Sequence, residues 1–124
     1  MYSLSIFGTS SDAGKSTLAF AITYLLHKRG IKVAPFKAQN VSNNSVVCDS
    51  GGEIAQPQAF AAESIGLKTT PLFNPVLLKS GNKNSASMIL GGVEQGQKDV
   101  RQYYRDINQL KPIVESAFLA LKSE

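Results

Sequence analysis

The sequence has a single cysteine, a single histidine and no long apolar run. Cys48 cannot form a disulfide within the chain, and His27 alone cannot complete a set of zinc ligands with it. Without a histidine partner, the Cys48 thiol is expected to be structural and unreactive. No stretch approaches the roughly 20 apolar residues that span a bilayer, and no basic leader precedes the first apolar segment. We therefore expect a cytoplasmic protein with no membrane partner.

The composition is that of one globular domain. The chain has 124 residues, of which 43% are apolar, so it is long enough to bury a core. Thirteen Lys and Arg residues outnumber nine Asp and Glu residues, which gives a net charge of +4. This excess suits an anionic ligand. The basic residues are scattered and are not interleaved with aromatic residues, so no nucleic-acid partner is expected.

The first third of the chain has the pattern of a strand, a helix and a second strand. Residues 3–7 are apolar and β-prone, and residues 31–36 repeat this character. Between them, residues 15–29 carry apolar side chains at helical spacing, with cations near the end and Gly30 as the stop. Because the connections are short, the unit predicts a right-handed parallel crossover and an α/β fold.

Later segments give a weaker pattern. Short strands are predicted over residues 76–78 and 88–90. Helices are predicted over residues 53–65 and 99–122, and Pro112 should divide or kink the second of these.

A phosphate-binding loop is predicted between the first strand and the first helix. Residues 8–17 have the sequence Gly-Thr-Ser-Ser-Asp-Ala-Gly-Lys-Ser-Thr. Glycines let the backbone approach a phosphate, and the N–H groups at a helix N-terminus bind the anion. Lys15 adds a positive charge for the β- and γ-phosphates, and Ser16 offers a hydroxyl ligand to Mg²⁺. The nucleotide-binding candidates are Gly8, Thr9, Asp12, Ala13, Gly14, Lys15, Ser16 and Thr17.

The spacing of this loop departs from the usual pattern. One extra residue lies between Gly8 and Gly14 when the loop is compared with G-x-x-x-x-G-K-[ST]. The longer form resembles the dethiobiotin synthetase group of P-loop proteins. Related partitioning ATPases carry a second lysine five residues before the P-loop lysine. Ser10 occupies that position here, which argues against a partitioning ATPase.

Three further motifs carry a more specific resemblance. They are Pro-Phe-Lys-Ala-Gln-Asn at residues 35–40, Gly-Gly-Glu-Ile at 51–54 and Asn-Pro-Val-Leu-Leu-Lys at 74–79. In this order behind such a loop, the chain resembles the cobyric acid synthase family over about residues 3–117. The resemblance implies a P-loop NTPase-like α/β fold with a mostly parallel sheet flanked by helices, incomplete in this chain.

The resemblance also implies the reaction. Members of the family use ATP and glutamine to amidate the b, d, e and g carboxylates of adenosylcobyrinic acid a,c-diamide in cobalamin biosynthesis. A carboxylate is a poor electrophile, so ATP would convert it to an acyl phosphate that glutamine-derived ammonia can attack. Mg²⁺ and lysines would offset the moving charge.

Within this scheme Lys15 and Lys37 are the catalytic candidates. Lys37 follows the second predicted strand, from which it can reach the γ-phosphate or the substrate carboxylate, and the alternative is an exposed lysine at a strand end. Ser16 and Glu53 are the predicted Mg²⁺ ligands. The alternative role for Glu53 is a carboxylate at a helix N-terminus, and the role of Asp12 is left open.

The polar segment 39–52 is predicted to be a long functional loop. Four of its residues match the polar loop of the family and are the predicted contacts to the corrin substrate: Gln39, Asn40, Asn44 and Ser45. Local turn chemistry is the alternative for each of them.

The resemblance further predicts that the chain is the N-terminal part of a larger synthetase domain. The second acidic Mg²⁺ ligand of the family and the C-terminal glutaminase domain, which supplies the ammonia, lie outside these 124 residues. The chain alone is therefore expected to be inactive. An unfinished sheet edge is expected to favour association with a second copy.

Other interpretations remain open from the sequence. A dethiobiotin-synthetase-like ligase shares the loop and Lys37 but activates a carbamate formed on a diamine. A non-catalytic nucleotide-binding module also fits this chain in isolation. A basic scaffold for acidic partners rests on the net charge alone.

Overall fold

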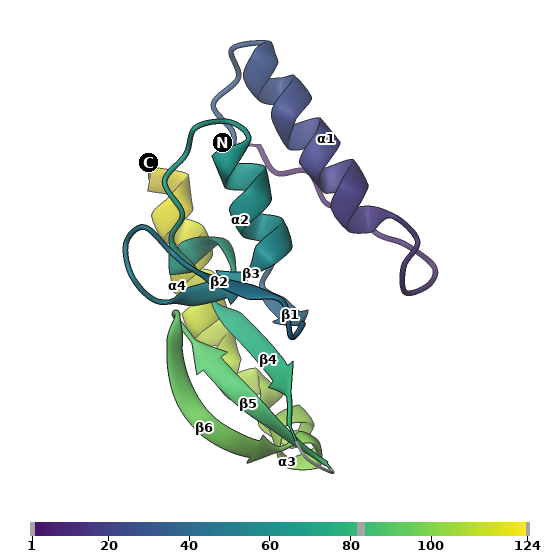
Figure 1. Ribbon diagram of the computed structural model, residues 1–124, viewed down its shortest axis with the longest axis vertical. Coiled ribbons are helices and arrows are strands. Elements are labelled where there is room, and N and C mark those ends of the chain that lie inside the picture. Colours follow the sequence, from purple (N-terminus) through teal and green to yellow (C-terminus); the bar gives the residue numbers. More distant parts are fainter. Residues whose placement is uncertain (1, 82–83, 124) are drawn as a thin grey trace.

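A computed structural model describes residues 2–81 and 84–123. In chain order the elements are α1 (Lys15–Lys28), β1 (Gln39–Val41), β2 (Ser45–Val47), β3 (Glu53–Ala55), α2 (Gln56–Glu63), η1 (Pro71–Phe73), β4 (Val76–Ser80), β5 (Ser85–Leu90), β6 (Val93–Asp99), α3 (Val100–Arg105), η2 (Ile107–Leu110) and α4 (Lys111–Ser123). In Figure 1, α1 stands to one side of the molecule, and α4 runs behind the strands. No helix in the described part of the chain is long and apolar enough to cross a membrane.

The main sheet is mixed. Its order is β1-β4-β5-β6, and β2 and β3 form a separate antiparallel hairpin. β1 runs parallel to β4, whereas β4, β5 and β6 form an antiparallel meander. The α/β class is confirmed, but within the described residues only one of the three strand pairs of this sheet is parallel.

The two strands predicted in the first third of the chain are not formed in the described structure. Residues 3–7 and 31–36 belong to no strand. An apolar, β-prone sequence does not make a strand without a hydrogen-bonded neighbour, and the side chains of Leu4 and Phe7 are 67% and 90% exposed. The predicted crossover between these segments is therefore wrong, and β1 and β4 form the parallel pair instead.

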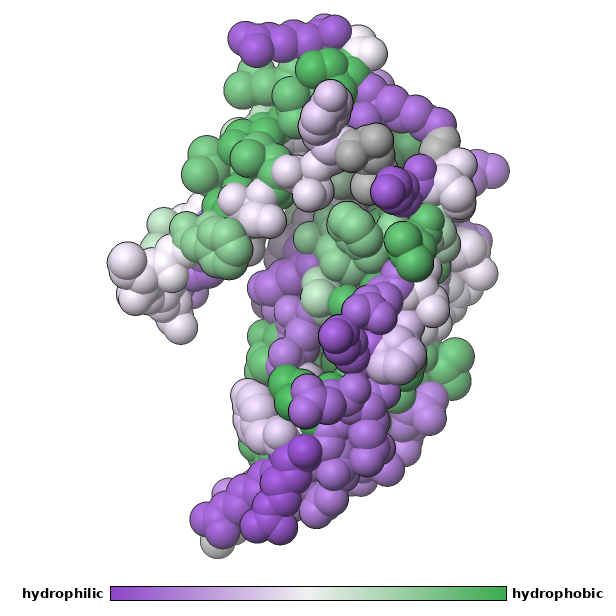
Figure 2. All heavy atoms as spheres, turned by 180° about the vertical axis from the view of Figure 1, so that it is seen from behind, coloured by the Kyte–Doolittle hydropathy of each residue, from purple (hydrophilic) through white to green (hydrophobic). Residues whose placement is uncertain are grey.

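The predicted first helix is confirmed as α1. It begins after Gly14, ends with His27 and Lys28 in its last turn, and is followed by Gly30 at a φ of 75°. α1 contacts α2, but much of its apolar surface is uncovered. Figure 2 shows these apolar side chains along α1 at the upper left.

The polar segment 39–52 is not one loop, because it contains β1 and β2. Residues 53–55, predicted as the first turn of a helix, pair with β2 as β3. Val46 and Val47 favour this pairing because β-branched side chains pack well on a pleated strand. The predicted helix is confirmed over Gln56–Glu63, with Pro57 in its first turn.

The strands predicted at residues 76–78 and 88–90 are confirmed as parts of β4 and β5. β6 is not predicted from the sequence, because its residues are mostly polar and exposed and show no alternation with apolar ones. β6 joins β5 through Gly91 and Gly92, which have φ values of 54° and 83°. Such values favour glycine, so this pair marks the turn.

The predicted division of the last helix is also confirmed. α3 ends at Arg105, η2 follows, and α4 begins at Lys111 with Pro112 as its second residue. Proline is tolerated there because the backbone N–H groups of the first helical turn have no intrahelical acceptor, so the N–H that proline lacks is not needed.

Alternate residues of β4 face different layers, as expected for a strand. Val76 and Leu78 pack with Tyr103 of α3, and α4 adds to the same cluster. Leu77 packs on the opposite face with Ala55 of β3 and with β5. The helices α3 and α4 therefore cover one face of the sheet, and the β2–β3 hairpin lies over the other face, which carries the polar site described below.

Candidate nucleotide and substrate site

The loop over residues 8–14 brings Lys15 back over its own backbone. Lys15 Nζ donates a hydrogen bond to the carbonyl oxygen of Ser10 at 2.6 Å. The Lys15 side chain passes so close to Gly8 that a Cβ there would lie 3.0 Å from it. A side chain at position 8 would displace Lys15, so the loop needs its first glycine for this close approach.

The N-terminus of α1 is open to an anion. Its cap residue, Gly14, has a φ of 85°, makes no side-chain cap hydrogen bond, and is followed by no acidic residue in the first turn. The first N–H groups of the helix have no intrahelical partner and carry the positive end of the helix dipole. Ser16 and Thr17 are exposed beside them. This arrangement is suited to a phosphate group.

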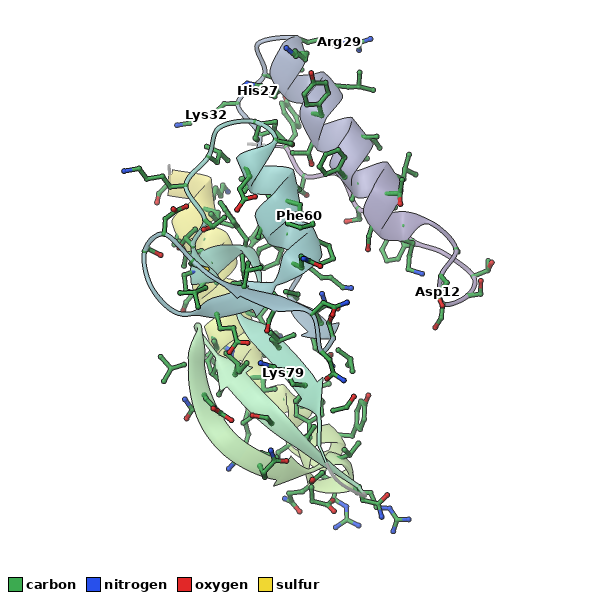
Figure 3. The ribbon with its side chains drawn as sticks, viewed as in Figure 1. Asp12, His27, Arg29, Lys32, Phe60 and Lys79 are labelled. Atoms are coloured by element: carbon green, nitrogen blue, oxygen red, sulfur yellow. The ribbon has the colours of Figure 1, made fainter. Side chains whose placement is uncertain are left out.

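Other loop residues lie farther from this position. Thr9 and Ala13 are exposed. Asp12 has a φ of 55°, and Figure 3 shows it at the tip of the loop, directed away from the rest of the molecule. Its carboxylate therefore does not face the α1 N-terminus in this structure.

Lys37 belongs to a chain of polar side chains on the site face of the sheet. Lys37 Nζ donates to Asn40 Oδ1 at 3.0 Å, and Asn40 Nδ2 donates to Gln58 Oε1 at 3.2 Å. Asn40 and Gln58 are buried. Gln58 was not among the predicted site residues, because its position in α2 gives no local signal of a contact with β1.

The charges of Lys37 and Lys15 lie close enough to interact. Burial lowers the pKa of Lys37, and the charge of Lys15 lowers it further. No carboxylate in the described part of the chain contributes to this pKa. The positive charge of Lys15 disfavours the Lys37 ammonium, so an anion bound near Lys37 would offset this effect.

Asn74 fixes the backbone at Lys37. Its side chain is 1% exposed. Asn74 Nδ2 donates to the carbonyl oxygens of Lys37 and Val76, each at 3.0 Å, and Oδ1 accepts from the N–H of Ala55 at 3.1 Å. The Lys37 N–H also donates to the Phe73 carbonyl at 2.8 Å. One buried side chain therefore joins the segment before β1 to β3 and β4.

Glu53 is held by two donors. Lys79 Nζ lies 2.5 Å from Glu53 Oε1, and the Ser45 hydroxyl donates to the same oxygen. Burial alone would raise the pKa of Glu53, but the hydrogen bonds from Lys79 and Ser45 and the charge of Lys79 outweigh it, so the pKa is lowered and the group is ionised. The helix-capping alternative for Glu53 is wrong, because the cap of α2 is Ala55.

The other predicted substrate contacts are separated from this cluster. Gln39 lines a cavity of about 170 Å³ together with Tyr103 and Lys111, on the opposite side of the sheet from Asn40. The Asn44 backbone carbonyl accepts hydrogen bonds from the Gln56 N–H and the Ser42 hydroxyl, and these backbone contacts do not decide between a substrate contact and turn chemistry for its side chain.

Cys48 has the properties of a structural thiol. It is unpaired and 5% exposed, and it packs in the core between the β2–β3 hairpin and α2. Burial raises the pKa of the Cys48 thiol to about 11, although a hydrogen bond with Thr69 opposes this. Groups of three or more His, Cys, Asp or Glu side chains suited to a metal ion do not occur among the described residues.

An α/β fold with a phosphate loop opening its first helix defines a P-loop NTPase-like nucleotide-binding domain. The chain belongs to the family described as CobQ/CobB/MinD/ParA nucleotide binding domain, which matches residues 4–122. Its resemblance to cobyric acid synthases is confirmed by curated relatives.

Cobyric acid synthase of Acinetobacter baylyi is 56% identical over 121 residues, which cover 98% of this chain and 26% of that protein. Probable cobyric acid synthase of Archaeoglobus fulgidus is 45% identical over 125 residues, or 100% of this chain and 27% of that protein. Cobyric acid synthase of Nocardia farcinica is 41% identical over 121 residues, which cover 98% of this chain and 23% of that protein. The chain therefore spans about a quarter of the length of these relatives. No solved structure matches it.

Proposed function

We propose that this chain forms the ATP-binding part of a cytoplasmic cobyric acid synthase, an ATP-dependent glutamine amidotransferase of cobalamin biosynthesis. The observation that carries the proposal is the loop ahead of α1, in which Lys15 folds back onto the Ser10 carbonyl beside the uncapped helix N-terminus. The names of the relatives support the reaction, since each is a cobyric acid synthase or a probable one.

In this proposal the first N–H groups of α1 and the ammonium of Lys15 bind the β- and γ-phosphates. We assign Lys37 to the γ-phosphate side of the same position, where its ammonium would stabilise the charge that develops as the γ-phosphoryl group passes to a substrate carboxylate. Asn40 holds the Lys37 ammonium at 3.0 Å, and Asn74 fixes its backbone, so the lysine is positioned before the substrate binds.

The chain also offers oxygen ligands for Mg²⁺. The Ser16 hydroxyl is exposed at the start of α1, and Glu53 is ionised, so both are hard oxygen donors of the kind Mg²⁺ prefers. Glu53 is already engaged by Lys79 and Ser45, so an ion there would compete with those two donors. When bound, Mg²⁺ would neutralise phosphate charge during the transfer.

The substrate we propose is adenosylcobyrinic acid a,c-diamide, with amidation of its b, d, e and g carboxylates. We assign Asn40 and Ser45 to the corrin contacts. In this structure Asn40 is bonded to Lys37 and Gln58, and the Ser45 hydroxyl donates to Glu53. These bonds would have to exchange for bonds to the substrate. The relatives are about four times as long as this chain, and we assign the release of ammonia from glutamine to a glutaminase domain in the remainder of such a protein. The 124-residue chain alone is then expected to have no synthase activity.

The test is a calorimetric titration of the chain with Mg²⁺ and a non-hydrolysable ATP analogue. We expect saturable binding that Lys15→Ala abolishes. Lys28→Ala, at the other end of α1, is the matched control and should leave binding unchanged. Binding that survives Lys15→Ala and disappears with added salt would instead identify a basic scaffold and contradict the proposal. Binding accompanied by turnover of ATP without substrate would contradict the expected inactivity.

A further inference from the structure

A third lysine lies on the site face of the sheet. β1 and β4 are parallel with Asn40 opposite Leu77, so these two side chains point to the same face. Lys79 is two residues beyond Leu77 and returns to that face about 6.6 Å further along the strand. Lys79 therefore lies on the same face as Asn40, which accepts a hydrogen bond from Lys37.

The Lys79 ammonium is fixed but accessible. Glu53 Oε1 lies 2.5 Å from Lys79 Nζ, and the Lys79 and Glu53 side chains are 33% and 28% exposed. Ser45 donates to the same carboxylate oxygen and so holds Glu53 in place. In Figure 3, Lys79 lies on β4 beneath the β2–β3 hairpin. A partly exposed ion pair of this kind contributes little to stability, so its close geometry needs another explanation.

The bonding of the Lys79 ammonium is incomplete. A lysine ammonium has three N–H donors, and Glu53 is the acceptor that the described residues provide. Its other donors are available to a second oxygen ligand. A carboxylate forms a charge-assisted hydrogen bond with such an ammonium, so a substrate carboxylate could bind here in competition with Glu53.

We propose that Lys79 is a second carboxylate-binding residue for the substrate, and that Glu53, held by Ser45, occupies the Lys79 ammonium until a substrate carboxylate binds there. The inference rests on the proposed function, in which the substrate carries several carboxylates. One carboxylate would lie at Lys37 beside the phosphate, and another would reach Lys79 and fix the orientation of the corrin. Lys79 would then set which carboxylate is presented for activation.

Opposite effects of two substitutions test this role. Cobyrinic acid a,c-diamide is titrated into the chain in Mg²⁺-free buffer, and binding is followed by calorimetry. Lys79→Met removes the ligand and should weaken binding by about tenfold or more, whereas Lys79→Arg should retain most of it. Glu53→Gln keeps the side-chain shape but removes the competing charge, so binding should tighten by about threefold. An ion pair that served only the fold would weaken binding in both variants.

The controls separate this inference from the proposed function. Lys98→Met, on the exposed strand β6, should not change corrin binding. A corrin whose carboxylates are all methyl esters should bind the unsubstituted chain and Lys79→Met equally. Titration with the ATP analogue in the same Mg²⁺-free buffer should be unaffected by Lys79→Met, and circular dichroism checks that each variant is folded.

Three results would overturn the inference. Corrin binding that is equal in Lys79→Met and the unsubstituted chain refutes it, while intact nucleotide binding leaves the proposed function standing. Equal weakening by Lys79→Met and Glu53→Gln assigns the pair to the fold. If the chain binds the ATP analogue but no corrin, both this inference and the corrin contacts proposed above are refuted. If the chain binds neither the ATP analogue nor the corrin, the proposed function is refuted.

Discussion

Replacement of Asn74 by alanine should be the most informative change outside the phosphate loop. The Asn74 side chain is buried and makes three hydrogen bonds to the backbone of Lys37, Ala55 and Val76. These bonds join three segments that are distant in the sequence. Alanine removes all three bonds and leaves their backbone partners in a buried environment.

The loss of stability in Asn74→Ala follows from these three hydrogen bonds. A hydrogen bond of this kind contributes about 0.5–1.5 kcal/mol, and a buried partner left unsatisfied costs about 1–3 kcal/mol. With partial relaxation around the site, we expect Asn74→Ala to lower the free energy of unfolding by about 3–5 kcal/mol. This is a large share of the roughly 5–15 kcal/mol that stabilises a typical domain. Because Lys37 keeps its N–H bond to Phe73 but loses the bond to its carbonyl, its position should be less fixed, and affinity for the ATP analogue should fall as well.

Urea denaturation followed by circular dichroism measures the first effect. The midpoint should fall with an unchanged slope. Asn108→Ala, at an exposed position in η2, is the control and should change stability by less than about 0.5 kcal/mol. Asn74→Asp should lower the free energy of unfolding at neutral pH, because a carboxylate would face two carbonyl oxygens. Stability should recover as the pH falls and that carboxylate is protonated. A loss below about 1 kcal/mol for Asn74→Ala would refute the reasoning.

Three further outcomes follow from the described contacts. Cys48 should react slowly with iodoacetamide at pH 8 in the folded chain, because burial raises the pKa of its thiol to about 11. It should react quickly in urea. Equal rates in the two conditions would contradict its burial. Phosphate binding should raise the lowered pKa of Lys37 toward its usual 10.5, so the protein should take up protons when it binds at alkaline pH. Because the buffer supplies these protons, the measured binding enthalpy should depend on the buffer. Lys37→Met should remove this dependence. A buffer-independent enthalpy in the unsubstituted chain would contradict this coupling. The exposed apolar residues of segment 3–7 and α1 should drive self-association, which sedimentation equilibrium measures. The double substitution Phe7→Ser and Leu25→Gln should reduce this association. A monomer at all concentrations of the unsubstituted chain would contradict the prediction.

Local patterns predicted the parts of the fold that depend on local chemistry. α1 follows from helical spacing and a glycine stop, and the phosphate loop follows from glycines ahead of Lys15. β4 and the end of β5 follow from short apolar runs, and the division before α4 follows from Pro112. In each case the residue types that define the element lie within a few positions of one another.

Features that depend on distant partners could not be predicted. Residues 3–7 have the composition of a strand, but a strand exists only where another one pairs with it. The pairing of Lys79 with Glu53 joins residues 26 positions apart and is set by the register of the sheet and the hairpin. Gln58 meets Asn40 because α2 packs over the site face, and no local pattern encodes that contact.

The central claim is that a nucleotide binds between Lys37 and the start of α1. Amide hydrogen exchange, measured by mass spectrometry with and without Mg²⁺ and the ATP analogue, tests it most directly. We expect slower exchange over residues 9–17 and around Lys37, with no change in β5 and β6. Unchanged exchange over residues 9–17 at saturating nucleotide, or slowing confined to other segments, would contradict it.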